Sequence, residues 1–220
     1  MPVLIVASAV ADRSLVSLAT LKTELGISGT DYDAKLTAWG KAASDIVCSV
    51  CGIAADQQGR RTLITEAFTV SYRASEVPQR CGDPAPLLLP WRLPLTISAV
   101  TADGTALTVV DDVECEPMAG LLWRLDEDGE RTHWTRGRIT ITASAGWAQD
   151  DVPEAARQAV IRYVRERYDG DGRNSLLKAE ESDGVGRDEY WIGPTSKGDA
   201  LPADMVDALR ASGLVNVAIG

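Results

Sequence analysis

Residues 134–147 read WTRGRITITASAGW, and residues 152–160, which follow a short polar stretch, read VPEAARQAV. Ile139 and Ile141 alternate with threonines, which is the period-two pattern of a strand with one buried face. A glycine and three polar residues then end the strand, and Pro153 stands where proline is tolerated, at the first turn of a helix. This stretch predicts a strand, a turn and a helix, and it determines the organisation of the second half of the chain.

The composition is that of a globular protein. The chain has 220 residues, of which 45% are hydrophobic, enough for a core in one large domain or in one domain with an inserted module. No stretch approaches the roughly 18 to 20 apolar residues that a membrane span needs. The apolar start at residues 1–9 is similar to the central part of a signal peptide, but no basic residues precede it, which argues against secretion.

The charge balance is strongly acidic, with a formal net charge of -10. Proteins that read duplex DNA normally present a basic face, so this balance argues against a sequence-specific DNA-binding protein. An acidic protein can still line a passage through which DNA slides without adhering, because like charges repel. Solubility alone is the simpler interpretation of the charge for an isolated protein.

The cysteines raise the question of a metal site. Cys48 and Cys51 have the spacing of a zinc-ligand pair, but no second pair follows at a matching distance. Cys81 and Cys115 stand alone, and His133 is the only histidine. We therefore expect reduced cysteines that pack in the core as small apolar residues, and no metal.

The chain changes its hydrophobic period twice. Helical spacing is present in residues 17–26, 31–51, 153–168 and 202–212. Between the second and third of these helices the period is two, in residues 62–73, 95–100, 106–110, 121–125, 132–134 and 139–145. Asp103-Gly104 and Asp128-Gly129 separate neighbouring runs, and this dipeptide favours tight hairpin turns because they need positive φ. The middle of the chain is therefore expected to be antiparallel.

The predicted fold class is α+β, a helical bundle formed by the N- and C-terminal helices with an inserted antiparallel β module. We expect an N-terminal helical hairpin over residues 1–60 and the β module over residues 61–148. Over residues 149–220 we expect a helix, a mobile loop, a short helix and a tail, packed on the N-terminal helices. Long loops of this kind are usually functional or disordered.

The sequence lacks the usual marks of an enzyme. It contains no nucleophile elbow, no phosphate-binding loop and no H-E-x-x-H motif. His133 stands in a predicted strand, where an ordinary half-exposed side chain is expected. The acidic pairs at 111–112, 150–151 and 180–181 fall in predicted loops and are expected to be solvated. We therefore expect no catalytic residues and no cofactor.

Taken together, the pattern resembles the head–tail connector proteins of tailed phages, also called adaptor or head-completion proteins. The resemblance is carried by residues 15–27 and 31–52, similar to the first two helices of that family, and by residues 93–104, similar to its central hairpin. Its most specific part is Trp134 and Gly137, the strand at Ile139, Gly146-Trp147, Val152-Pro153 and Gln158-Ala159.

The resemblance implies a non-enzymatic ring protein, commonly a dodecamer, that binds beneath the portal at one capsid vertex. Such a protein extends the DNA channel and presents an attachment surface for neck and tail components. The implied partners are the portal protein, neighbouring copies in the ring and a downstream neck or tail-completion protein. DNA would pass without sequence-specific binding, and no membrane is involved. The implied location is the virion neck, after synthesis in the host cytoplasm.

Two candidate contact sites accompany this resemblance. The candidate portal-binding residues are the apolar ones on the last helix and tail, Met205, Leu209, Leu214, Val215, Val217 and Ile219. The candidate loop for contacts with a neighbouring copy or the neck contains Val185, Arg187, Asp188, Glu189, Tyr190 and Trp191. An exposed aromatic residue in a polar loop is typical of a protein contact.

Other interpretations stay open at this point. The β module is larger than in many connectors, so its strands could widen the ring, contact the capsid or recruit a tail-completion protein. Alternatively, the chain is a tail-associated or carbohydrate-binding β-module protein without catalytic activity, which tryptophans exposed on that module would favour. A hydrolase that uses His133 is a third interpretation.

Overall fold

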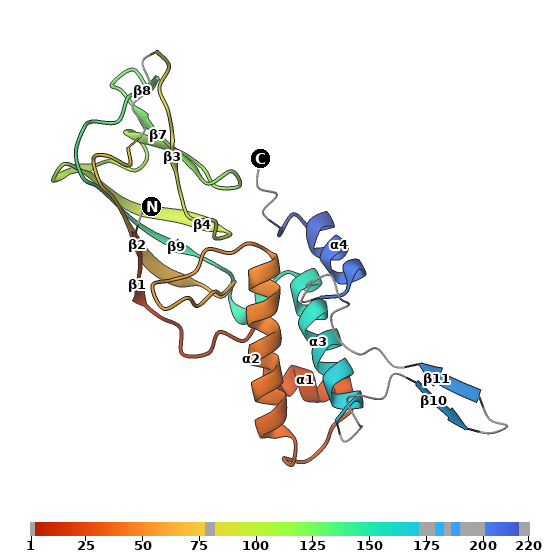
Figure 1. Cartoon of the computed structure of the whole chain (residues 1–220). Coiled ribbons are helices and arrows are strands. Elements are labelled where there is room, and N and C mark those ends of the chain that lie inside the picture. Colours follow the sequence, from red (N-terminus) through yellow and green to blue (C-terminus); the bar gives the residue numbers. More distant parts are fainter. Residues whose placement is uncertain (1–2, 78–81, 172–178, 183–185, 190–200, 216–220) are drawn as a thin grey trace. The chain divides into compact units, whose positions relative to one another are not determined.

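The computed structural model describes residues 3–77, 82–171, 179–182, 186–189 and 201–215, and the chain forms two compact units (Figure 1). The sheet unit contains Met1–Ser14 and Gly52–Val152. The helical unit contains Leu15–Cys51 and Pro153–Val215. Within the described residues, no helix is both long and apolar enough to cross a membrane.

A five-stranded antiparallel sheet forms the larger part of the sheet unit. Its order is β1 (Val3–Ser8), β2 (Glu66–Tyr72), β9 (Ile139–Ala145), β4 (Leu95–Ala102) and β5 (Thr105–Leu107). Burial alternates along β9, so Ile139 and Ile141 are fully buried while the threonines between them are half-buried. The strand predicted at residues 139–145 is therefore confirmed.

A second sheet completes the core of this unit. It contains β3 (Leu87–Leu88), β7 (Leu121–Leu125) and β6 (Val113–Glu116), and β8 (Arg131–Thr132) pairs with β7. Leu87 and Leu122 belong to the same buried cluster as Phe68 and Ile141 of the first sheet. Burying a side chain of this size contributes about 1.5–3 kcal/mol, so this shared cluster is the main stabilising feature of the unit.

The two predicted hairpins differ in their turns. Asp103 and Gly104 have φ angles of 48° and 83°, as the predicted tight turn between β4 and β5 requires. The hairpin of β7 and β8 also forms, but its loop is wider than predicted. There the backbone N–H of Asp126 donates to Glu130 O at 2.9 Å, and Gly129 supplies the positive φ of 80°.

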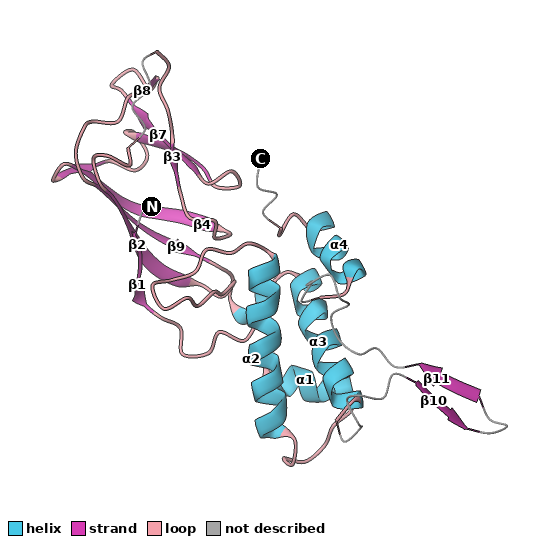
Figure 2. Cartoon of the chain, in the orientation of Figure 1, coloured by secondary structure: helices cyan, strands magenta, loops and turns pink. Residues whose placement is uncertain are grey.

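The helical unit is built from α1 (Leu18–Leu25), α2 (Asp33–Val50), α3 (Glu154–Asp169) and α4 (Ala203–Ala211) (Figure 2). The predicted caps of α1 are confirmed, because the Ser17 hydroxyl accepts from Thr20 N at 3.1 Å and Gly26 has a φ of 67°. Between α2 and α3, the Tyr32 and Tyr168 rings meet edge to face with centroids 5.1 Å apart.

One short hairpin lies in a segment that the sequence pattern assigns to a loop. Strands β10 (Ala179–Ser182) and β11 (Gly186–Glu189) pair antiparallel, from Ala179↔Glu189 to Ser182↔Gly186. The loop prediction is therefore wrong for these residues. Their polar sequence lacks the apolar alternation that marks the other strands, so the hydrophobic pattern does not reveal them.

The predicted fold class is wrong. The described chain is mostly antiparallel sheet with four α-helices in the described part, not a helical bundle of terminal helices with an inserted β module. The difference begins at β1, which pairs with β2 from Val3↔Ser71 to Ser8↔Ala67, so the sheet starts before the first helix. The sequence VLIVAS has no polar alternation, and an apolar run of this length does not identify itself as a strand.

Candidate functional site

The predicted portal-binding residues lie on and after α4. Met205 and Leu209 are 5% and 0% exposed, so both pack inside the helical unit. The helix end is closed by Gly213, with a φ of 72°, and by Leu214, whose N–H donates to Leu209 O at 3.1 Å. Leu214 is buried by this cap and Val215 is half-buried. The structure therefore brings these residues together as packing residues of α4.

The remaining predicted contact residues are only partly within the described chain. The backbone of Arg187, Asp188 and Glu189 forms most of β11. The other predicted residues lie outside the described residues, and they are Val185, Tyr190, Trp191, Val217 and Ile219. Their proposed contacts stay predictions.

A shallow groove of about 290 Å³ lies between α3 and α4. Ala159, Ile161 and Met205 contribute apolar lining, while Arg162 pairs across the groove with Asp204. This hydrogen-bonded pairing raises the pKa of Arg162 and lowers that of Asp204. Each charge is therefore compensated by the other, and neither group is prepared to exchange a proton near neutral pH.

The sheet unit contains a buried ionic cluster, here called the Glu66 cluster, made of Arg13, Asp56, Glu66 and Arg92. Glu66 is 1% exposed, and one of its oxygens accepts from Arg13 Nε at 2.9 Å and from Val10 N at 3.1 Å. Its other oxygen accepts from Arg92 Nη1 at 3.1 Å. The two guanidinium groups compensate the cost of burying this carboxylate.

The Glu66 cluster extends through Asp56. The carboxylate of Asp56 accepts from Arg13 Nη2 at 3.1 Å and from the backbone N–H groups of Gln58 and Arg60 at 2.8 and 2.9 Å. Arg92 Nε also donates to Ala54 O at 3.1 Å. The cluster thus fastens three connecting segments of the sheet unit to the start of β2, and its geometry is that of a structural site.

Sequence reasoning missed the Glu66 cluster, although one signal was present. Side chains alternate between the two faces of β2, and Glu66 is two and four residues from Phe68 and Val70. All three side chains therefore point into the core. An acidic residue at a core-facing position needs a compensating charge. The identity of that charge could not be read from the sequence, because Arg13 and Arg92 are distant from Glu66 along the chain.

The cysteines and the histidine show no catalytic arrangement within the described residues. Cys48 and Cys51 are fully buried, as predicted for core cysteines, and burial raises the pKa of Cys51 to about 12. Cys115 is free and half-buried, while Cys81 lies outside the described residues. His133 is exposed, with Nε2 3.2 Å from Gly82 O. Among the described residues, no group of three or more histidine, cysteine or acidic residues is placed to hold a metal.

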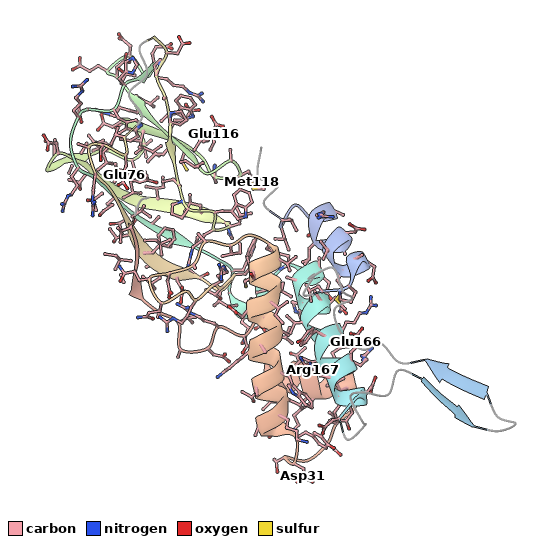
Figure 3. All side chains as sticks on the ribbon, in the orientation of Figure 1. Asp31, Glu76, Glu116, Met118, Glu166 and Arg167 are labelled. Atoms are coloured by element: carbon pink, nitrogen blue, oxygen red, sulfur yellow. The ribbon has the colours of Figure 1, made fainter. Side chains whose placement is uncertain are left out.

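The second sheet carries an exposed polar cluster beside an apolar turn (Figure 3). Glu116 accepts from Trp123 Nε1 at 3.0 Å and from Arg131 Nη2 at 2.8 Å, and the Arg131 guanidinium lies 4.1 Å from the centre of the Trp123 ring. Trp123 is therefore covered on one face, and Trp134 is only 3% exposed. Met118, in the turn between β6 and β7, is 66% exposed.

The most specific sequence segments meet at the end of β9. Gly146 N–H donates to Pro94 O at 3.1 Å, and Trp147 N–H donates to Leu63 O at 2.8 Å. Gly146 has a φ of 119°, and a Cβ at this position would lie 2.4 Å from the carbonyl carbon of Ile64. The backbone approaches too closely here for any residue except glycine. Residues 93–95 and 146–147, which both carry the resemblance to connectors, are thus neighbours in the fold.

No protein-family model matches the chain, and no curated protein matches its sequence. Among solved structures, it is similar to a chain in the "Virion of native gene transfer agent (GTA) particle", with 19% sequence identity and a TM-score of 0.49. The match covers 79% of this chain and 88% of that one. A likeness of this strength supports no inference about function.

Proposed function

We propose that this chain is a structural protein of a tailed phage or phage-like virion. Within the virion we assign it the role of head–tail connector, a non-enzymatic ring protein beneath the portal that extends the DNA channel. It would sit in the neck and provide the attachment surface for neck and tail components. Its partners would be the portal, neighbouring copies and a downstream neck or tail-completion protein.

The observation that carries the proposal is the junction at Gly146. The sequence segments that resemble connectors are separated along the chain, but the hydrogen bond from Gly146 to Pro94 O joins two of them. The chain then continues through Trp147 into α3, in the order that the resemblance implies. This arrangement supports the view that the matching segments belong to one structural motif.

The charge of the molecule supports the DNA-channel part of the proposal. Lysine and arginine number 22 against 32 acidic residues, so a ring of copies would present a strongly acidic surface to DNA. Such a surface repels the phosphate backbone, and DNA could move past it without being retained. We propose no sequence-specific contact with DNA and no catalytic step.

Binding to the portal tests the proposal directly. Purified chain should cosediment with the assembled portal of the same particle and should saturate at a fixed ratio of subunits. The control is the same portal mixed with an unrelated acidic protein of similar size. Absence of saturable binding would contradict the connector role.

A truncation tests the predicted portal anchor separately. Removing residues 216–220 leaves the Gly213 and Leu214 cap of α4 in place, so the helical unit should unfold at the same temperature as before. We expect the truncated chain to lose portal binding, because the apolar end of the tail is removed. Full binding after this truncation would refute the anchor while leaving the connector role intact.

A further inference from the structure

The five-stranded sheet has one buried face and one face without charge. The strand register aligns Ile5, Thr69, Thr142 and Ala99 in one row across β1, β2, β9 and β4. Each of these residues has a neighbour along its strand that is buried in the core. The side chains of the row therefore lie on the face away from the core. The face away from the core is therefore made of small polar and aliphatic side chains along this row.

The next row across the sheet has the same character. It contains Val3, Ser71, Thr140 and Thr101, again one residue from each of the four strands. We call these two rows the neutral face. Along the strands of an antiparallel sheet, core residues normally alternate with polar and charged residues, and the polar and charged residues form the solvated face. Because a quarter of the residues in this chain are charged, two complete rows without a charge are a distinct surface.

The neutral face ends at an unprotected edge. In the described residues β1 pairs only with β2, and its sequence VLIVAS contains neither a charge nor a proline. Val3 and Ile5 are 43% and 44% exposed on this edge strand. Natural proteins usually protect such edges with charged residues, prolines or covering segments, because a free edge pairs with other chains. Within the described residues, the edge and the neutral face are thus continuous, and neither carries a charge or a proline.

The charge of the chain indicates which partner fits this surface. Two copies that each carry a net charge of -10 repel one another wherever their acidic surfaces meet. Contact between copies is therefore favoured at a surface from which acidic side chains are absent, and the cores of interfaces are depleted in charged residues in general. We propose that the neutral face and the β1 edge form the surface through which one copy of this chain contacts the next.

This inference rests on the proposed ring function, and it names the surface that such a ring would use. A ring needs head-to-tail contacts, in which a surface of one copy meets a different surface of its neighbour. The neutral face supplies one of these two surfaces, and the free edge of β1 adds unpaired backbone groups that can hydrogen-bond to the neighbour.

A charge placed in the middle of the neutral face tests the inference. In Thr142→Lys, association would bury an unpaired ammonium group, so we expect self-association at least about tenfold weaker than in the unchanged chain. The matched control is Thr105→Lys, which adds the same charge to an exposed position in the same sheet but outside the neutral face. Light scattering over a concentration series measures association, and urea unfolding verifies that both variants are folded.

The outcomes separate this inference from the proposed function. A selective loss of association in Thr142→Lys supports the neutral face as the contact between copies. Equal association of all three proteins would overturn it, and so would an unchanged chain that stays monomeric at every concentration. Portal binding of the same proteins is measured separately. If the neutral face is refuted but portal binding is retained, the proposed connector role is unaffected.

Discussion

At the scale of single residues, Glu66 combines almost complete burial with ion pairs to the guanidinium groups of Arg13 and Arg92. Glu66→Gln removes the charge and leaves Arg13 and Arg92 without their common counter-ion. Breaking a buried ion pair in this way costs about 3–5 kcal/mol, so urea unfolding at neutral pH should show a loss of that size. Glu114→Gln is the control, since its pairing with Arg131 is exposed and screened by solvent, so its loss of stability should be clearly smaller. Equal losses in the two variants would contradict the structural role of the cluster.

Asp56 gives the Glu66 cluster a defined dependence on pH. Burial acts to raise its pKa, but hydrogen bonds from the backbone of Arg60, from Arg13 and from the backbone of Gln58 outweigh burial and lower the pKa to about 2. Because the folded pKa lies below the unfolded value near 3.8, the ionised group stabilises the fold above that pH. This contribution is lost as the pH falls towards 2.

The pH dependence leads to a second prediction at this scale. The free energy of unfolding of Asp56→Asn should lie about 2 kcal/mol below that of the unchanged chain at pH 6, because the ionised carboxylate is favoured in the folded state. The difference should narrow between pH 4 and pH 2. Urea titrations of both proteins across this range measure it, and a constant difference at all pH values would show that ionisation of Asp56 is not the cause.

At the scale of elements, the end of β9 depends on Gly146. Gly146→Ala places a Cβ 2.4 Å from the carbonyl carbon of Ile64, and backbone on both sides must move to admit it. Gly82→Ala has nearly the same positive φ of 118° but no atom within 4 Å of the added Cβ, so it isolates the cost of the backbone conformation, about 1–3 kcal/mol. We expect Gly146→Ala to cost about 1–3 kcal/mol more than Gly82→Ala in urea unfolding. Similar costs would indicate that the junction is adaptable.

Elements with a local signal could be predicted from the sequence. The turn at Asp103-Gly104, the strand at Ile139–Ala145 and the capped helix at Leu18–Leu25 all depend on residues that are neighbours in the chain. Strand β1 could not be predicted in this way, because its apolar run has no alternation and its partner β2 is distant in sequence. The same distance concealed the pairing of Glu66 with Arg13 and Arg92. The sequence pattern therefore does not reveal contacts between distant segments. One of these contacts, the pairing of β1 with β2, accounts for the wrong fold class.

At the scale of the whole molecule, the acidic charge makes a prediction about DNA. Because 32 acidic residues outnumber 22 basic ones, the chain should not be retained by duplex DNA at moderate salt. Fluorescence anisotropy of a labelled duplex should stay at its free value as the protein is added, and lowering the salt concentration should not produce binding. Tight binding that weakens with added salt would contradict a channel past which DNA slides.

The central claim is that this protein connects the phage head to the phage tail. Producing the particles without the protein tests this claim most directly. We expect DNA-filled heads and separate tails in electron micrographs, and we expect purified chain added to the heads to restore their joining to tails. Complete, joined particles in the absence of the chain would contradict the claim.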